Sequence, residues 1–333
     1  MIGPVISRRA LMAGAAASGA GLTRRASAQA HPSQSYPNRV IKMIVPFAPG
    51  GPADTMARLA AQQLSTRLGQ SVIIDNRAGA GGSIATKAVA GAEPDGYTLL
   101  FGNTATFAVA PAVYVNIGYD PVKQFAPIAL FSVSTNLLVA DPKLPVQSVP
   151  ELIAHAKANP GKINFASPGY GTPPHMIGEM FKQRAGLDIV HVPYKGTAAA
   201  LTDIMAGQVQ LTFENPSVLV QLIHEGKLRG LATTGEVRNP QTPELPTMIE
   251  SGLPDFISTS FTALAAPAGT APDIVRRINA EINAGLNSAE LGSTFAKLGV
   301  GARPLTPGGF GAFLVRENQK WSAVARAANI RIE

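Results

Sequence analysis

The chain has 333 residues, of which 46% are hydrophobic and 15% are charged, and it contains no cysteine. This composition supports a large core, and the length exceeds what one compact domain usually holds, so two domains are expected. The lack of cysteine excludes disulfides, thiolate metal sites and a lipid-anchored cysteine, and no basic run with interleaved aromatic residues supports nucleic-acid binding.

Residues 1–30 are predicted to be an export signal. Arg8 and Arg9 form a twin-arginine pattern, a weakly apolar stretch follows, and Ala28-Gln29-Ala30 has the small residues of a cleavage site. The stretch is too short and too weakly apolar to span a bilayer; a disordered tail is the alternative. These residues include four arginines and no acidic residue, so the formal charge of +7 falls to +3 in the remainder.

A buried strand, a tight turn and a helix are predicted in succession near the start of the remaining chain. Val40–Val45 is apolar and mostly β-branched except for Lys42, Pro46–Pro52 is rich in proline and glycine, and a helix is expected from about Ala53 to Leu68. The free N–H groups of that helix point toward the strand end, where a small anion could bind. On this stretch alone, an ordinary strand–turn–helix connection without a ligand is the better explanation.

The next two predicted strands end in similar loops. Ser71–Ile74 is followed by a glycine-rich loop and a helix over Ser83–Ala90, and Tyr97–Phe101 ends close to Thr104. The glycine spacing fits neither a dinucleotide fingerprint nor a P-loop, but N–H groups and the Ser83 hydroxyl could meet a hydrogen-bond acceptor. Three successive strand ends with small or hydroxyl residues favour a binding site at that edge of the sheet.

The rest of the chain predicts a second α/β unit and two passages between units. Residues 128–140 form a long apolar run that could be two strands, or one strand passing between domains. Ser148 is expected to cap a helix that ends at Ala158, and residues 162–233 alternate short strands and helices, which predicts a mostly parallel sheet. Phe256–Ala266 is predicted to be a second crossing strand. Helices are expected after it, with a possible edge strand at 330–332.

Six loop motifs occur in one order and spacing that resembles a known family. They are Pro46-Phe47-x-x-Gly50-Gly51-x-x-Asp54, Asn76-Arg77-x-Gly79-Ala80-Gly81-Gly82, Pro94-Asp95-Gly96-Tyr97-Thr98-Leu99, a serine/threonine–glycine loop at 167–175, Val192-Pro193-Tyr194-Lys195-Gly196, and Ala268-Gly269-Thr270-Ala271-Pro272. From about Tyr36 to Glu333 the chain resembles the tripartite tricarboxylate transporter receptor family, also called Bug proteins.

The resemblance implies an α/β fold of the type II periplasmic binding protein (Venus-flytrap) class, with a ligand cleft between two α/β domains. Domain 1 is expected to comprise 36–132 and 259–333, and domain 2 to comprise 133–258. Such receptors bind a small carboxylate through backbone N–H groups, hydroxyls and water, and deliver it to tripartite tricarboxylate-type transporter subunits in the membrane. A periplasmic monomer with no cofactor, no metal and no enzyme activity is therefore expected.

The resemblance also implies which residues bind the ligand. The loops 48–54 and 167–175 would form the two jaws of the cleft, and further loops would flank them. The implied ligand-binding residues are Ala48, Gly50, Gly51, Asp54, Gly81, Gly82, Ser83, Thr104, Ser167, Gly171, Thr172, His175, Lys195, Glu214 and Asn215.

The expected roles of these residues differ. Ser167 is favoured as a ligand contact, and Thr172 is expected both to cap its helix and to touch the ligand. His175 could contact the ligand or hydrogen-bond the loop backbone. Asp54 is expected to cap or order its own loop, and Lys195 is a surface lysine unless it reaches the cleft rim.

Departures from the family pattern concern the ligand more than the fold. Glu214 stands where the family commonly has aspartate, residues 260–262 stand where it often has tryptophan, and residues 197–199 lack the usual extra glycines.

Two other functions compete with solute delivery. A ligand sensor with the same fold would show the same sequence. A hydrolase would use Ser167 or Ser83 as nucleophile and His175 as base, but neither serine lies in a Gly-x-Ser-x-Gly elbow and no orienting acid is evident. His191 is expected to be isolated and structural or exposed.

Overall fold

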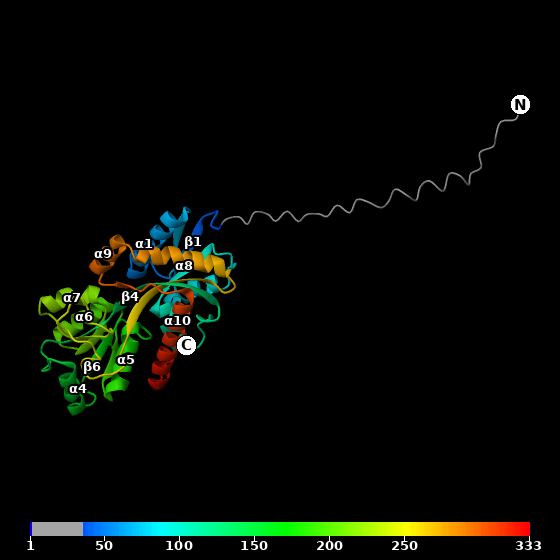
Figure 1. Cartoon of the computed structure of the whole chain (residues 1–333). Helices are drawn as coiled ribbons and strands as arrows, with labels where there is room; N and C mark the ends of the chain where they lie inside the picture. Colours follow the sequence, from blue (N-terminus) through cyan, green and yellow to red (C-terminus); the bar gives the residue numbers. More distant parts are fainter. Residues whose placement is uncertain (2–35) are drawn as a thin grey trace. The chain divides into compact units, whose positions relative to one another are not determined.

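Two β-sheets, each flanked by helices, make up the part of the chain that the computed structural model describes (Figure 1). Met1 and residues 36–333 are described, so the predicted export signal at 1–30 lies outside the described residues apart from Met1. Pro37–Glu333 form one compact unit and Met1–Tyr36 are assigned to another. Both sheets belong to Pro37–Glu333.

The first sheet has six strands in the order β11-β4-β10-β3-β1-β2. Strand β1 runs parallel to β2 and β3, whereas β10 is antiparallel to β3 and β4. All of β1 except Lys42 is buried, which confirms the buried strand predicted from its β-branched residues. The strands are β1 (Ile41–Val45), β2 (Val72–Asn76), β3 (Thr98–Asn103), β4 (Phe125–Thr135), β10 (Thr259–Pro267) and β11 (Gly301–Ala302).

The second sheet has five strands in the order β7-β6-β8-β5-β9. Strand β6 is parallel to β7 and β8, but β5 is antiparallel to β8 and β9, so the sheet is mixed rather than mostly parallel. The chain enters this sheet directly from the first one, since a single residue, Asn136, separates β4 from β5. The strands are β5 (Leu137–Ala140), β6 (Asn164–Ser167), β7 (Val190–Pro193), β8 (Leu211–Glu214) and β9 (Arg229–Thr233).

The chain passes between the sheets twice. The apolar run at 128–140 is two strands, with β4 in the first sheet and β5 in the second. The predicted second crossing strand is instead an inner strand of the first sheet, because β10 pairs only with β3 and β4. Residues 234–258 make the return passage.

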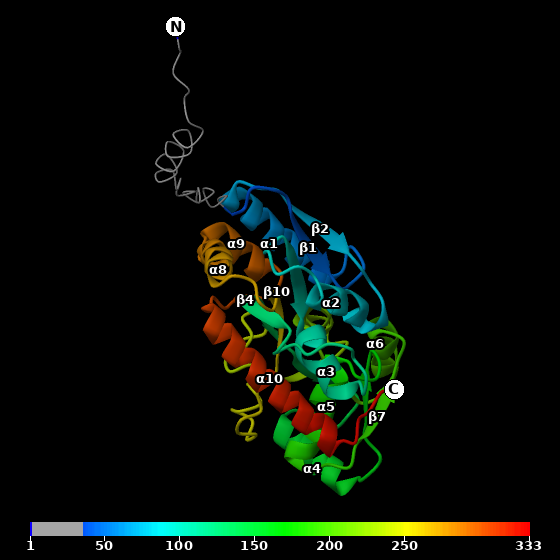
Figure 2. The ribbon, with the colours of Figure 1, turned by 90° about the vertical axis from the view of Figure 1, so that its right-hand side faces the viewer.

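Helices flank both sheets, and α10 contacts elements of each. It packs on β4 and α3 beside the first sheet and on α5 beside the second. Gln183 of α5 donates from Nε2 to the Val324 carbonyl of α10 at 3.1 Å, and Figure 2 shows α10 running toward α5. The helices are α1 (Pro52–Leu68), the 3-10 helix η1 (Ala80–Gly82), α2 (Ser83–Ala90), the π-helix η2 (Ala105–Val109), α3 (Ala110–Val113), α4 (Val149–Ala158), α5 (Pro173–Ala185), α6 (Thr197–Ala206), α7 (Pro216–His224), α8 (Pro272–Leu286), α9 (Ala289–Lys297) and α10 (Pro307–Ala327).

Two predicted helix caps have different outcomes. The Ser148 hydroxyl accepts from the Glu151 N–H at 3.3 Å at the start of α4, which confirms that cap. Thr172 stands at the predicted N-cap position, directly before Pro173 at the start of α5, but its side chain makes no cap bond to the helix. Its hydroxyl instead donates to the Gly169 carbonyl at 2.7 Å and closes the preceding loop.

One hydrophobic cluster runs through both sheets. It includes Phe107 and Phe261 beside the first sheet, Phe165 and Phe213 of the second, and Trp321 of α10, each at most 2% exposed. A continuous core of this kind couples the two halves energetically.

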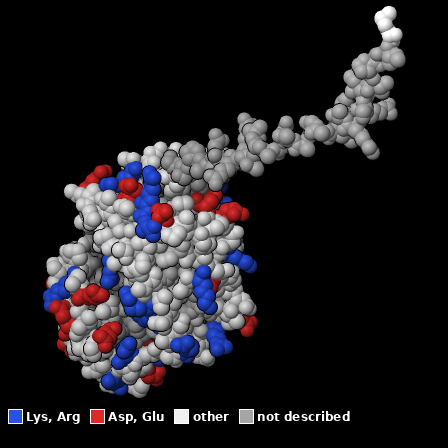
Figure 3. Space-filling view, turned by 45° about the vertical axis from the view of Figure 1, so that its right-hand side comes forward, with Lys and Arg blue, Asp and Glu red and all other residues white. Residues whose placement is uncertain are grey.

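One face of the described surface carries side chains of both charges. Basic and acidic side chains are interspersed on the face shown in Figure 3, with no uniformly basic area of the kind that nucleic acids need. Within residues 36–333, no helix has the length and apolar character of a membrane span, and no three His, Asp or Glu side chains gather as a metal site.

Candidate ligand-binding site

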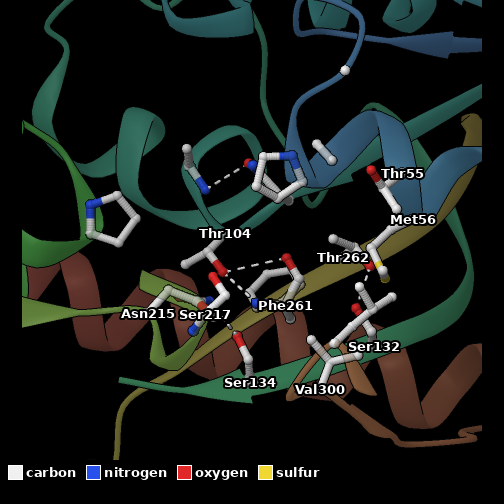
Figure 4. A pocket seen from close by; sticks show the side chains of 18 residues that line it. Thr55, Met56, Thr104, Ser132, Ser134, Asn215, Ser217, Phe261, Thr262 and Val300 are labelled. Atoms are coloured by element: carbon white, nitrogen blue, oxygen red, sulfur yellow. Dashed lines mark hydrogen bonds between the residues drawn. The ribbon is translucent and has the colours of Figure 1, made fainter. Parts of the chain in front are cut away.

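A cavity of about 410 Å³ lies where elements of the two sheets meet (Figure 4). The turn before α1, the start of η2, strands β4 and β10 and the α9–β11 loop line it from the first sheet's side, and the starts of α5 and α7 line it from the second. The size lies within the usual range of small-molecule sites. Its lining residues are Gly50, Pro52, Ala53, Thr55, Met56, Asn103, Thr104, Ala105, Ser132, Ser134, Pro173, Asn215, Ser217, Ser260, Phe261, Thr262, Leu298 and Val300.

None of these described lining residues carries a charge. Half of them have a hydroxyl or amide side chain, and most of the others are aliphatic or proline. Any charged ligand in this cavity must therefore be held by neutral donors, backbone N–H groups and water.

Strands β4 and β10 form the floor of the cavity. Ser132 and Thr262 are register partners, and their hydroxyl oxygens lie 2.7 Å apart. Thr104, which is 2% exposed, accepts from the Phe261 N–H at 2.7 Å and so fixes the start of η2 to β10. The floor thus belongs to the same two strands that neighbour the passages between the sheets.

Asn215 links the two halves across the cavity. It precedes α7, and its side-chain oxygen accepts from the Ser217 N–H at 2.9 Å as an N-cap. Its Nδ2 donates to the Ser134 hydroxyl of β4 at 3.3 Å. One side chain therefore orders a helix beside the second sheet and contacts a strand of the first.

Asp54 orders the turn before α1, as expected from the sequence. Its buried carboxylate accepts from the Gly50 N–H at 2.9 Å, from Arg58 Nε at 2.8 Å and from Asn76 Nδ2 at 3.0 Å. The hydrogen bond from Arg58 is the main cause that holds the pKa of Asp54 below its usual range. The carboxylate is thus ionised and engaged within the protein, and it does not line the cavity.

A pair of stacked histidines, His175 in the first turn of α5 and His191 in β7, lies beside the loop before α5. The rings of His175 and His191 lie 3.9 Å apart between centroids, and the Ser167 hydroxyl lies 2.6 Å from His191 Nε2. His175 Nδ1 accepts from the Gly171 N–H at 3.1 Å. Burial lowers the pKa of His175 to about 4 and that of His191 to about 3, so both imidazoles are neutral at pH 7. The expectation that His191 is isolated is wrong.

Ser167 pairs with a different histidine from the one that the hydrolase alternative requires. Ser167 is fully buried, and its partner is His191 rather than His175. Within the described residues, His191 Nδ1 has no hydrogen-bond partner, so no acid orients the ring. The hydrogen bonds of Ser167 with His191 and of Gly171 with His175 position the loop before α5.

The comparisons with known proteins agree with this architecture. The sequence model of the tripartite tricarboxylate transporter family receptor matches residues 56–330. The chain belongs to this receptor family.

Relatives of this receptor cover nearly its whole length. It is 38% identical over 302 residues to Protein BugT of Bordetella pertussis, covering 90% of this chain and 93% of BugT. Among solved structures, Rpa4515 of R. palustris with adipate is 36% identical, with a TM-score of 0.75 over 89% of this chain and 99% of the other. MatC of Rhodopseudomonas palustris with bound malate is 32% identical, with a TM-score of 0.72 over 87% and 99%. The fold is thus that of a type II periplasmic binding protein with two α/β domains.

Of the residues predicted to bind ligand in this receptor, Gly50, Thr104 and Asn215 line the cavity. The others lie outside its lining. They are Ala48, Gly51, Asp54, Gly81, Gly82, Ser83, Ser167, Gly171, Thr172, His175, Lys195 and Glu214.

The glycines before α2 are explained by their backbone conformation and by close packing. Gly82 has φ +93°, and a Cβ there would lie 2.8 Å from Thr106 Cγ2 and 2.9 Å from Pro46 Cβ. Gly81 also has a positive φ, and Ser83 begins the helix. Their backbone geometry explains the glycines without a ligand.

The two predicted residues around α6 differ in burial. Lys195 is exposed. Glu214 is buried and accepts from the Thr197 hydroxyl at 2.9 Å and from the Asn215 N–H at 3.1 Å. Burial raises the pKa of Glu214 above its usual range, although the two hydrogen bonds that it accepts oppose this shift.

Most of the cavity lining was missed from the sequence. The missed residues with hydroxyl side chains on β4 and β10 are Ser132, Ser134, Ser260 and Thr262. The sequence did contain a pattern that indicates them: each strand carries two hydroxyl residues at a spacing of two, which places both side chains on one face of the sheet. The aliphatic residues Met56, Leu298 and Val300 carried no such signal.

Proposed function

We propose that this receptor captures a small carboxylate in the cavity between its two sheets and delivers it to a tripartite tricarboxylate-type membrane transporter. The observation that carries the proposal is a cavity of about 410 Å³ that is lined from both halves of the fold by uncharged residues. The carboxylates named with the relatives, adipate and malate, support the ligand class.

Neutral donors around the cavity suit a carboxylate. Helix α1 begins at Pro52, so the N–H groups of Ala53 and Asp54 have no partner within the helix, and the positive end of its dipole lies at the cavity wall. The hydroxyls of Ser134 and Ser217 lie on the opposite side. Each charge-assisted hydrogen bond contributes about 1.5–3 kcal/mol, so a few of them replace the ligand's hydration without a cation.

Closure around the ligand would give the receptor a shape that the transporter can distinguish from the open, ligand-free shape. We propose that 36–132 with 259–333 and 133–258 move as two domains. A ligand that touches both favours the closed state by the contacts made only there. Export to the periplasm through the twin-arginine segment at 1–30 is part of the same proposal.

Binding calorimetry on ligand-stripped protein tests the capture step. Mono-, di- and tricarboxylates form the panel, with neutral sugars as the negative set. Ser134→Ala removes a hydroxyl at the Asn215 side and is expected to weaken the bound acid roughly tenfold, the cost of one charge-assisted bond. Ser132→Ala is the matched control, because its hydroxyl pairs with Thr262, and it should change affinity less. Binding of sugars but of no acid would overturn the carboxylate assignment.

A further inference from the structure

The last residue of β3, Asn103, reaches the cavity at the edge of the first sheet. It is the register partner of Thr262 in β10, and β3 runs parallel to β1, which leads into the turn before α1. The carboxyl ends of parallel strands meet at one edge of a sheet. Asn103 therefore lies between the floor of the cavity and the start of α1, where Gly50, Pro52 and Ala53 also line the cavity.

The side-chain amide of Asn103 is held in one orientation. Its Oδ1 accepts from the Ala105 N–H at 3.0 Å and from the Thr106 N–H at 3.3 Å at the start of η2. Because these two N–H donors require an oxygen opposite them, the amide cannot be turned round. Its Nδ2 has no hydrogen-bond partner among the described residues, so both of its hydrogens remain for a ligand or water.

The hydroxyl side chains on the first sheet's side of the cavity are already engaged within the protein. Their partners are the Gly51 carbonyl for Thr55 at 3.2 Å, the Phe261 carbonyl for Thr104 at 3.5 Å, Asn136 Oδ1 for Ser260 at 3.4 Å, Thr262 for Ser132 at 2.7 Å and Asn215 Nδ2 for Ser134 at 3.3 Å. Ser134 and the Ser132–Thr262 pair each keep one hydroxyl proton. In this part of the described lining, only Asn103 keeps two donor hydrogens.

A carboxylate beside Asn103 meets donors from two elements. The N–H groups of Ala53 and Asp54 have no partner within α1, and the positive end of the helix dipole lies at the same wall. The negative charge of the Asp54 side chain is paired with Arg58 at 2.8 Å. Since a carboxylate accepts several hydrogen bonds and the Asn103 amide offers two, the two groups are complementary, whereas a cation would face donors only.

Ordering the start of η2 does not by itself require asparagine. Aspartate and serine also accept hydrogen bonds from N–H groups a few positions later, and they differ from asparagine in lacking the amide nitrogen. We propose that Asn103 selects for a carboxylate in this receptor by donating from Nδ2 to the ligand beside the start of α1. The inference rests on the carboxylate function proposed above and assigns the side chain that recognises the charged group.

Asn103→Asp tests the assignment with little change in shape. The variant keeps an oxygen for the Ala105 and Thr106 N–H groups but replaces the donor Nδ2 by a charged acceptor. Calorimetry on ligand-stripped protein compares adipate and malate with adipamide and malamide, in which each carboxylate is an amide. The substitution is expected to weaken binding of the acids at least about hundredfold and binding of the diamides less than about tenfold, because an amide can donate to the new carboxylate.

Two further variants separate the lost donor from the added charge. Asn103→Ser keeps an acceptor oxygen on a shorter, neutral side chain, so it should weaken binding of the acids about tenfold. Asn287→Asp is the matched control, because this exposed residue follows α8 and does not line the cavity. It adds the same charge and should leave every affinity unchanged. Urea unfolding midpoints verify that each variant is folded, and Asn103→Ser decides if Asn103→Asp does not fold.

The outcomes separate the two proposals. If the Asn103 variants bind the acids as tightly as the unchanged protein, Asn103 only orders η2, and the inference fails while the carboxylate function stands. An equal loss for acids and diamides would also overturn the inference, because it would indicate a distorted cavity. If neither adipate nor malate binds, the most tightly bound acid of the panel above and its amide take their place. If no acid of that panel binds the unchanged protein, both proposals fail.

Discussion

At the scale of single residues, the stacked pair of His175 and His191 ties stability to pH. Both imidazoles are held neutral by burial, and their rings lie 3.9 Å apart. A proton on either ring would place a charge in a desolvated site, and protons on both would repel. The pair orders the loop between Ser167 and α5, so its protonation state bears on one wall of the site.

Acidification is expected to destabilise the protein through this pair. Each histidine titrates at its ordinary pKa of 6.5 when unfolded, but at about 4 for His175 and about 3 for His191 when folded. Below pH 6.5 the unfolded chain therefore binds more protons, and the free energy of unfolding falls as the pH falls. Above pH 6.5 both histidines are neutral in the folded and unfolded states, so this loss of stability is absent. Urea midpoints at pH 7.5 and 5.0 measure the loss.

A histidine variant separates this effect from other titrations. His191→Phe keeps an aromatic ring but removes one proton site, so its midpoint should fall less than that of the unchanged protein between the two pH values. His224→Phe, at an exposed position, should fall as much as the unchanged protein. An undiminished fall in His191→Phe would show that the pair is not the cause.

At the scale of elements, the turns that lead into helices shape the site. The junction of η1 and α2 is held against the end of β1 because Gly82 has no side chain. Its backbone has φ +93°, and the space that a Cβ would need is occupied by Thr106 and Pro46. The same close approach keeps the start of η2 beside the cavity.

Gly82→Ala is expected to be more costly than an alanine at an unobstructed turn. The positive φ alone costs about 1–2 kcal/mol, and overpacking adds about 1–3 kcal/mol. Gly186→Ala, at φ +61° with no atom within 4 Å of the added Cβ, isolates the first cost. Urea unfolding of both variants gives the difference, and equal losses would contradict the packing argument.

At the scale of the whole molecule, the shared core decides how the halves unfold. Separate domains often unfold separately, because interfaces between them are small. Here one apolar cluster includes Phe261 of the first sheet, Phe213 of the second and Trp321 of α10. Helix α10 itself contacts β4 beside the first sheet and α5 beside the second. We expect the two halves to unfold together.

A comparison of two probes tests this expectation. Trp321 is the only tryptophan and is fully buried, so its fluorescence reports on α10, while far-UV circular dichroism reports on all helices and strands. The two urea transitions should coincide as a single step. A dichroism change that precedes or follows the fluorescence change would show that the halves are independent.

Local signals predicted much of the fold. The strand at Ile41–Val45, the helix that follows the Pro/Gly turn and the cap at Ser148 all match, because β-branching, turn residues and cap residues act within a few positions. The mixed second sheet was not predicted. Its strand β5 runs antiparallel to both of its neighbours, and hydrophobic periodicity carries no information about strand direction.

The sequence by itself determined the order of strands and helices, the tight turns and, through six loop motifs, the family. Only the tertiary structure decided which side chains meet in the cavity. Ser132 and Thr262 pair across two strands that are 130 positions apart, and His191 reaches Ser167 only through the register of β6 and β7. Such pairings depend on strand order and register, which arise when the whole chain packs, whereas turns and caps depend on the residues beside them.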